Sequence, residues 1–399
     1  MQKLRFIIRI VSLLLLLQIS RSSYAHPFEI RFYGDTLKAE LPVATFPIYT
    51  HAIDMEAVRS FYAQLNELPY QPILHAIRDY KQQHQLSDWI YYQLIRKTAQ
   101  ELSPKEQNYN SYTLYKWFFL SKSGYDARLA VIENKLLFYV ETDENIYDIP
   151  SFERDGKQFI CLNYHDFGKI DFTKDLLLPI ELQVDEAKNA FSYKIEAMPD
   201  LVPGQFTEKD IRFSYKNKVY KFKVVLNPDV PTLFKNYPVT DFESYFNIPM
   251  SPQTYNSLIP SLKKAVSKMS MEQGVDYLME FTRNAFLYES DEEAYGKEKR
   301  LSPELTLFSK YSDCDDRAAF FFYIVKEIYN RPMIVLLYPT HVTVAVNFDK
   351  PLGNAVYYKN HAYAVCDPTP QLENMPVGEL SPRLKDVPYT IAYEYSPGR

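Results

Sequence analysis

The feature that most constrains the fold of this chain is a cysteine at the boundary between an acidic segment and a long apolar run. Cys314 lies within residues 311–317 (YSDCDDR), and residues 318–325 (AAFFFYIV) are apolar without interruption. This run is too apolar for a surface helix and long enough for a buried one, so it predicts a core helix beginning near Cys314. Unpaired N–H groups and the dipole at that helix end favour the thiolate, which is the nucleophilic form of cysteine.

Two further residues with acid–base chemistry follow in strand-like segments. Residues 333–338 indicate a buried strand, and polar and apolar residues alternate over 341–348, which is typical of a half-exposed strand. A third strand is predicted over 361–367, ended by a proline. If the last two strands form a simple antiparallel hairpin, residue numbers that sum to 708 face each other, and His341 lies opposite Asp367. A carboxylate beside an imidazole fixes its tautomer, and that imidazole can deprotonate a nearby thiol.

In this chain order, the three residues resemble the transglutaminase-like superfamily of papain-type cysteine enzymes. The motifs that carry the resemblance are SDCDDRA at 312–318, THVTVAV at 340–346 and VCDPT at 365–369. The segment SPEL at 302–305 is similar to the lead-in of bacterial members, and the match covers roughly the last third of the chain. Ser312 stands where many members have glycine, and this departure bears on the local turn and the oxyanion geometry.

The resemblance implies an α+β catalytic domain of helices packed on an antiparallel sheet. Cys314 would attack an amide or peptide carbonyl, His341 would share its proton, and Asp367 would orient the imidazole. The Cys314 backbone N–H would help to hold the oxyanion. Hydrolysis and transamidation both stay open, with a protein, peptide or peptidoglycan-type amide as substrate. We expect no cofactor and no metal.

Two other functions stay open. The first is a catalytically inactive transglutaminase-like scaffold that binds peptide or glycan. The second is a deacetylase or acetyltransferase with the same triad, which is disfavoured for an exported chain because its acyl-CoA donor is cytosolic.

Residues 1–25 have the pattern of a signal peptide. Basic residues precede an apolar core at 10–17, and in Ser23-Tyr24-Ala25 small residues stand three and one before the expected cleavage site. We expect an exported protein, periplasmic or secreted, with no membrane span after cleavage, since the core is shorter than the ~20 residues of a spanning helix. An uncleaved anchor is the alternative. Removing four basic residues takes the net charge from −5 to −9, which disfavours nucleic acid as a partner.

The length predicts two or three domains, because single cores stop growing near ~250–300 residues. Residues 26–170 indicate an α+β domain, 171–240 a β-rich domain or bridge, and 241–399 the transglutaminase-like catalytic domain. Residues 124–128 (GYDAR) resemble the turn that follows the catalytic helix in the family, so the first domain is hypothesised to be a degenerate copy. Aligning Asp126 with Pro332 puts Asn108 at the nucleophile position, where there is no thiol.

The remaining reactive residues are given structural roles. Three cysteines are too few for a disulfide framework, although one bridge between Cys161 and Cys366 stays open. The acidic residues beside Cys314 are expected to cap the helix, because the twelve-residue calcium loop with its central glycine is absent. Residues 285–301, rich in Glu and Lys, are expected to form a mobile loop near the cleft.

Overall fold

The computed structural model describes residues 26–42, 45–168, 170, 177–289, 299–370 and 374–398. The predicted signal peptide and residues 290–298 of the predicted loop lie outside the described residues.

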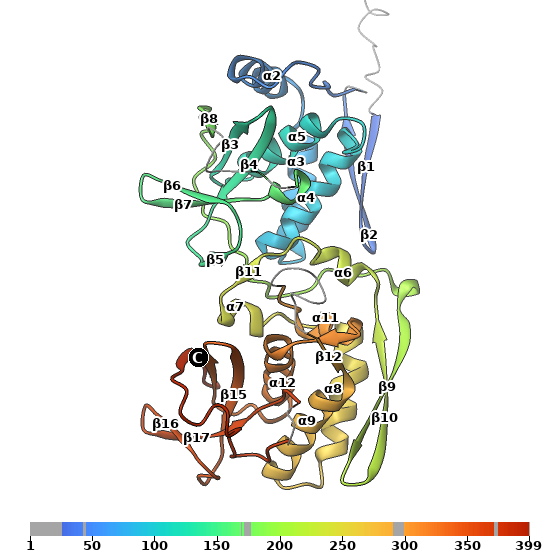
Figure 1. Ribbon diagram of the computed structural model, residues 1–399. Helices are drawn as coiled ribbons and strands as arrows, with labels where there is room; N and C mark the ends of the chain where they lie inside the picture. Colours follow the sequence, from blue (N-terminus) through green and yellow to red (C-terminus); the bar gives the residue numbers. More distant parts are fainter. Residues whose placement is uncertain are drawn as a thin grey trace, which may run out of the picture.

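The chain forms two α+β lobes, one stacked on the other (Figure 1). The elements of the N-terminal lobe are β1 (His26–Phe32), β2 (Asp35–Leu41), α2 (Met55–Glu67), α3 (Gln71–Gln83), α4 (Asp88–Leu102), α5 (Tyr109–Lys122), β3 (Ala127–Ile132), β4 (Lys135–Glu141), β5 (Ile146–Tyr147), β6 (Ser151–Arg154), β7 (Lys157–Cys161), η1 (Tyr164–Asp166) and β8 (Leu178–Ile180).

The second lobe follows a short 3₁₀ turn, η2 (Pro203–Gln205). Its elements, including those at the junction, are β9 (Thr207–Tyr215), β10 (Lys218–Leu226), α6 (Asp229–Leu233), β11 (Val239–Thr240), α7 (Phe242–Phe246), α8 (Pro252–Val266), α9 (Met271–Ala285), β12 (Leu287–Tyr288), α11 (Pro303–Phe308), β13 (Tyr311–Ser312), α12 (Cys314–Tyr329), β14 (Met333–Tyr338), β15 (His341–Asn347), β16 (Val356–Tyr358), β17 (His361–Cys366) and β18 (Thr390–Tyr395).

Each lobe contains a five-stranded antiparallel sheet, and the two sheets have the same topology. The strand order is β6-β7-β4-β3-β8 in the first lobe and β16-β17-β15-β14-β18 in the second. Two-residue turns join the corresponding strand pairs, at 133–134 and 339–340, and again at 155–156 and 359–360. The fold class is therefore α+β with antiparallel sheets, as the sequence predicted.

The shared plan extends to the elements that precede each sheet. The hairpin β1–β2 packs on α3 and α4, as the hairpin β9–β10 packs on α8 and α9. A further helix, α5 or α12, then leads directly into the sheet. Figure 1 shows sheet, helices and hairpin side by side in the same order in both lobes. This arrangement is what the hypothesis of an internal copy requires.

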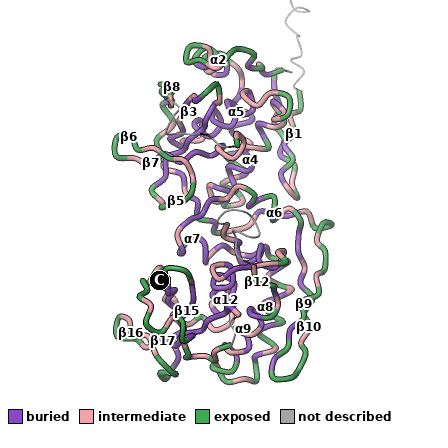
Figure 2. The backbone as a smooth tube through the Cα atoms, in the orientation of Figure 1, coloured by how far each residue is buried: buried purple, intermediate pink, exposed green. Residues whose placement is uncertain are grey.

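The helices α5 and α12 are the central elements of their lobes. Residues 111–122 of α5 and 316–325 of α12 are buried without interruption, because both helices lie between other helices and a sheet (Figure 2). Burial on all sides explains why both helices are rich in apolar residues, although each also buries charged side chains, such as Lys116 of α5 and Arg317 of α12. Within the described parts of the chain, no helix is long and apolar enough to cross a membrane.

Residues 171–240 contribute to both lobes. Strand β8 joins the sheet of the N-terminal lobe beside β3, whereas β9 and β10 pack on helices of the C-terminal lobe. Residues 191–197 of this segment are not part of any sheet. The middle segment is therefore a bridge between the lobes.

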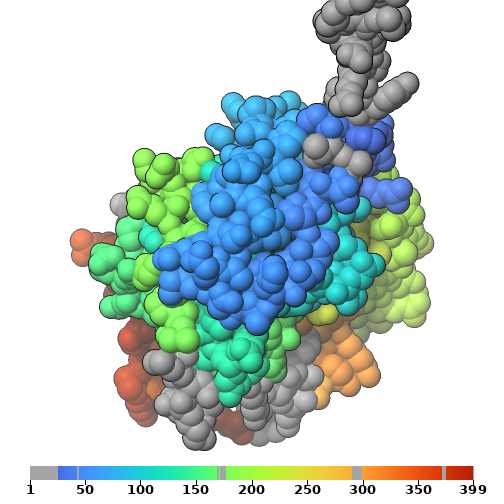
Figure 3. All heavy atoms as spheres, turned by 90° about the horizontal axis from the view of Figure 1, so that it is seen from above, coloured from blue at the N-terminus to red at the C-terminus, as the bar shows by residue number. Residues whose placement is uncertain are grey.

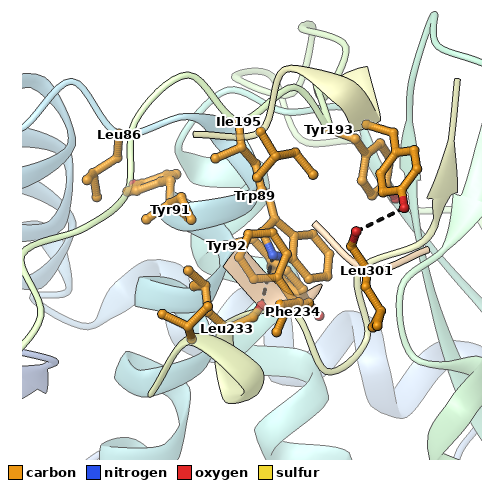
Figure 4. Close-up of a cluster of buried hydrophobic side chains, with 14 of the residues drawn as sticks. Leu86, Trp89, Tyr91, Tyr92, Tyr193, Ile195, Leu233, Phe234 and Leu301 are labelled. Atoms are coloured by element: carbon orange, nitrogen blue, oxygen red, sulfur yellow. Dashed lines mark hydrogen bonds between the residues drawn. The ribbon is translucent and has the colours of Figure 1, made fainter. Parts of the chain in front are cut away.

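An apolar cluster joins the lobes (Figure 4). Trp89 of α4 donates from its indole Nε1 to the Leu233 carbonyl at 3.1 Å, and its ring lies 6.0 Å from that of Tyr193. Trp89 is 2% exposed, and burying a side chain of this size stabilises the fold by about 4–6 kcal/mol. Seen from the N-terminal end (Figure 3), the first lobe covers most of the second.

Candidate functional site

Cys314 is the first residue of α12, as the sequence predicted. The preceding Asp313 caps the helix, because its Oδ1 accepts from the backbone N–H groups of Asp315 (3.0 Å) and Asp316 (3.2 Å). The Cys314 N–H has no hydrogen-bond acceptor among the described residues. It remains available for an oxygen atom that approaches the sulfur.

The sulfur of Cys314 is half-buried and lies at the start of β15. The backbone N–H of Val342 lies close enough to lower the pKa of the thiol, so the sulfur adjoins the peptide link between His341 and Val342. The thiol itself donates to Asp315 Oδ1, 3.3 Å away. No hydrogen bond joins the sulfur to the His341 ring in the described structure.

The environment of Cys314 opposes ionisation. Burial raises the pKa of the thiol, and the carboxylates of Asp315 and Asp313 raise it further. The expected thiolate is therefore not the resting form, because burial and the neighbouring carboxylates outweigh the helix dipole. Burial likewise raises the pKa of Asp313 to about 6, with a further contribution from Asp315.

His341 and Asp367 are in direct contact. His341 Nε2 lies 3.0 Å from Asp367 Oδ2, and the side chains are 10% and 2% exposed. The second carboxylate oxygen, Oδ1, accepts from the Thr369 backbone N–H at 3.0 Å. With its Nε2–H donated to Asp367, the neutral ring keeps a lone pair on Nδ1.

The strand register differs from the predicted simple hairpin. Val344 pairs with Cys366, and Ala345 pairs with Val365, so paired numbers sum to 710 rather than 708. The two strands are not joined by a simple hairpin, because β16 lies between them in the sequence and pairs with the other edge of β17. A shift of two residues keeps every side chain on its predicted face, so His341 and Asp367 still meet.

One face of the sheet packs against the main core, and His341 lies on the other face. Val342, Val344 and Val346 belong to the main core, against which α12 packs. The His341 ring lies 6.5 Å from that of Tyr338, whose side chain belongs to the cluster on the other face. The Cys314 sulfur lies by the Val342 backbone at the end of the sheet, where the first turn of α12 meets the start of β15.

Two buried arginines hold the site together. Arg317 donates to the carbonyl oxygens of Ser312, Thr282 and Phe286, and also to that of Arg283. Arg283 in turn donates to the Asp367 carbonyl oxygen. The end of α9 thereby ties the segment before Cys314 to the segment that carries Asp367. These roles were not predicted from the sequence, although the position of Arg317 directly before the apolar run of α12 was the available signal.

Three buried hydroxyl groups near the site have no hydrogen-bond partner among the described residues. They belong to Ser312, Tyr338 and Thr369, and each lies close in sequence to one of the candidate residues. Burial raises the pKa of Tyr338 to about 12, so it stays a neutral phenol. Unpaired buried hydroxyls are costly and are enriched at functional sites.

The corresponding position in the N-terminal lobe contains no thiol. Asn108 is the N-cap of α5, so Tyr109 rather than Asn108 corresponds to Cys314. By strand register, Lys135 corresponds to His341 and Asn163 to Asp367. Asn163 Nδ2 donates to the Tyr109 hydroxyl at 2.8 Å. None of these three side chains is a thiol or an imidazole.

The other two cysteines lie in packed interiors. Cys161 and Cys366 are both free, and both are 1% exposed or less. Their pKa values are raised by burial, to about 11 for Cys161 and further for Cys366. The bridge that the sequence left open is not formed.

Two groups of side chains have a spacing that a metal ion could accept. They are Asp313-Cys314-Asp315 and the set Asp35, His84 and Asp200. We assign no metal to either, because their atoms already bond within the protein. Asp313 caps α12, and the Tyr80 hydroxyl donates to Asp35 at 2.6 Å.

Comparison with known proteins gives no family assignment. No family model matches the chain, and no curated protein matches it either. Arguments about function therefore rest on the geometry of the site.

Proposed function

We propose that this chain is an exported, transglutaminase-like cysteine enzyme that performs acyl transfer at an amide or peptide bond. Cys314 is its nucleophile, His341 its general base and acid, and Asp367 the residue that orients His341. The observation that carries the proposal is the 3.0 Å contact of His341 with Asp367, next to the Val342 backbone N–H that favours the Cys314 thiolate.

The first half of the reaction follows from these contacts. Asp367 holds the Nε2–H of His341, so Nδ1 accepts the thiol proton as the Cys314 sulfur attacks the carbonyl carbon. The carbonyl oxygen gains the charge and accepts from the free Cys314 N–H. When the carbon–nitrogen bond breaks, the imidazolium returns the proton to the departing amine. A thioester remains on Cys314.

The second half transfers the acyl group to water or to an amine. His341 deprotonates the incoming nucleophile, and the sulfur leaves as the new bond forms. Water gives hydrolysis, and a primary amine gives transamidation. The acceptor decides between these two activities.

The raised pKa of Cys314 shapes this mechanism. Because the resting thiol is neutral and donates to Asp315, its proton must turn from Asp315 to His341 before attack. Proton transfer then accompanies attack, in place of a preformed thiolate. The enzyme should be slow until a substrate displaces the Asp315 contact.

The proposal is tested with a peptide mixture and a fluorescent primary amine. New amino termini report hydrolysis, and fluorescent peptide reports transamidation. Cys314→Ala should abolish whichever activity is present, whereas Cys161→Ala, which changes a thiol outside the site, should retain it. Activity that survives in Cys314→Ala would refute the proposal.

A second function is a scaffold of the same fold that binds peptide or glycan without turnover. The observation that favours it is the resting state of Cys314, whose thiol donates to a carboxylate and has a raised pKa. Binding that is equal in the wild-type chain and in Cys314→Ala, with no turnover of any amide, would support this reading.

A further inference from the structure

The hairpin β9–β10 carries an excess of positive charge near its turn. One face of the hairpin packs on α8 and α9 through buried side chains, and the other face is exposed. Residues 211–222, on both sides of the turn, contain four basic residues and no acidic one, whereas the whole chain has a net charge of −5. The four, all exposed, are Arg212, Lys216, Lys218 and Lys221. We call residues 211–222 the basic tip.

Two cations of the basic tip face each other across the strands. Arg212 is paired with Lys221 in the register of the hairpin, and both side chains lie on its exposed face. Like charges directly opposite each other destabilise a β-sheet. The pair therefore costs the fold some stability, which bound anions would offset.

The charges of the basic tip are not compensated within the part of the chain that the structure describes. None of its four basic side chains forms an ion pair or a side-chain hydrogen bond with a described residue. The ammonium groups of Lys216 and Lys218 lie over the rings of Tyr215 and Tyr220, 5.0 and 5.1 Å from the ring centres. A ring face attracts a cation but carries no net charge, so both groups can still pair with an anion.

The carboxylates that contact the hairpin lie outside the basic tip. Glu208 pairs with Lys223 at 2.6 Å, nearer the open end of the hairpin, and Asp210 lies opposite Lys223 in the register. Asp276 of α9 accepts from the Tyr215 hydroxyl at 2.8 Å on the packed face. No carboxylate of the hairpin thus lies among the four cations.

An exposed valine distinguishes the kind of anion that fits. Val219 lies between Lys218 and Lys221 in the sequence, faces the small Ser214 in the register and is 60% exposed. At a membrane surface, lipid phosphates lie next to acyl chains, so cations and an apolar side chain are satisfied together. A soluble polyanion offers charged groups without this apolar contact. The basic tip therefore fits a membrane better than a soluble polyanion.

The basic tip also lies where a flat surface can reach it. Figure 1 shows the turn between β9 and β10 at the end of the C-terminal lobe that is remote from the N-terminal lobe, and Figure 2 shows this end of the hairpin exposed. A membrane can therefore approach the basic tip without meeting the N-terminal lobe.

We propose that the basic tip docks this protein on a membrane surface that contains anionic phospholipids. The four cations pair with lipid phosphates, and Val219 packs at the level where the headgroups meet the acyl chains. No residue of the basic tip belongs to the candidate site. Docking is therefore separate from the proposed function and is expected whether or not Cys314 is acylated.

Docking is tested by sedimentation of the full chain with lipid vesicles. One set contains equal parts of phosphatidylglycerol and phosphatidylcholine, and the other contains phosphatidylcholine alone. Each cation near an anionic membrane surface strengthens binding about fivefold, so the chain should bind the first set several hundredfold more tightly than the second. This preference should be lost in about 1 M salt, where charges are screened beyond about 3 Å.

A matched pair of double variants localises the docking surface. Arg212→Gln with Lys221→Gln should weaken binding to the anionic vesicles about thirtyfold, since two contributions of about fivefold are lost. The two residues are exposed and repel each other, so this variant should be at least as stable as the wild type in urea titrations. Lys97→Gln with Lys188→Gln removes the same charge from exposed positions of the N-terminal lobe and should bind as the wild type does. Residues 1–25 contribute equally to every variant.

Val219→Ser separates a membrane from a soluble polyanion. It should weaken binding to the anionic vesicles several-fold, because serine has no apolar side chain to pack on acyl chains, and leave binding to inorganic polyphosphate unchanged. Equal binding of the two vesicle sets, or equal binding of the wild type and the variant at Arg212 and Lys221, would overturn the proposal. So would vesicle binding that Val219→Ser does not weaken, or tighter binding to polyphosphate than to vesicles.

Discussion

The contact between Cys314 and Asp315 makes a prediction that needs no knowledge of the substrate. Asp315→Asn keeps the size of the side chain but removes a negative charge 3.3 Å from the sulfur. The backbone N–H of residue 315, which donates to the Asp313 side chain at the helix cap, is unchanged. Since this carboxylate raises the pKa of Cys314, its removal should lower that pKa and increase the thiolate fraction at neutral pH.

The size of the effect follows from two opposing terms. Neighbouring charges at this distance change a pKa by about one to three, which multiplies the thiolate fraction by about ten to a thousand. A thiolate of lower pKa is also a weaker nucleophile, with a Brønsted coefficient of about 0.4–0.5. The net alkylation rate at neutral pH should therefore rise about threefold to fiftyfold.

The assay is the rate of iodoacetamide labelling of Cys314, followed by mass spectrometry of its peptide. Cys161 and Cys366 serve as internal controls, because both are buried and should stay unlabelled while the protein is folded. Asp210→Asn, an exposed carboxylate of β9, is the control for net charge. An unchanged or slower rate in Asp315→Asn would refute the electrostatic account of Cys314.

Three further predictions concern single side chains. His341→Gln should lower acyl transfer about 10²–10⁴-fold in steady-state assays, whereas folding measured by circular dichroism stays intact. In the native state Asp313 holds its proton more tightly than in the unfolded state, because its pKa is raised to about 6. Stability should therefore fall as pH rises from about 4 to 6, by about 3 kcal/mol, and Asp313→Asn should flatten this slope in urea titrations. Burial lowers the pKa of Lys116 to about 7, so the wild-type stability should rise between pH 7 and 10. Lys116→Met should stabilise the fold at pH 7 by up to about 4 kcal/mol in urea titrations, and a loss of stability would contradict this.

The sequence was sufficient to locate the elements that carry the candidate site. The apolar run at 318–325 predicted a buried helix, and α12 confirms it. The alternation after His341 predicted a half-exposed strand. The strand is present, but residues 342–346 are all buried, because apolar clusters cover both of its faces. Because side chains alternate with a period of two, the predicted faces survived a register shift of two residues.

Other features depended on contacts that local patterns do not encode. The pKa of Cys314 depends on whether Asp315 turns toward the sulfur or away from it, and a helix start allows both. The roles of Arg283 and Arg317 depend on the carbonyl groups that lie nearby in the folded chain. Strand β16 is short and partly exposed, so it has a weak sequence signal.

The likeness of the two lobes was also only partly visible in the sequence. The turn at 124–128 suggested a copy, and at the positions that correspond to the candidate site residues the first lobe has Tyr109, Lys135 and Asn163. The two lobes share strand order and turn length where these side chains differ.

The account depends on Cys314 acting as the nucleophile of a site that His341 activates. The most direct measurement is reaction of the full chain with p-nitrophenyl acetate, an activated acyl donor, followed by mass spectrometry of the cysteine peptides. The account predicts a burst of p-nitrophenolate and an acetyl thioester on Cys314 alone, formed much more slowly in His341→Gln. Acetylation that is absent, that occurs equally on Cys161 and Cys366, or that is as fast in His341→Gln would contradict it.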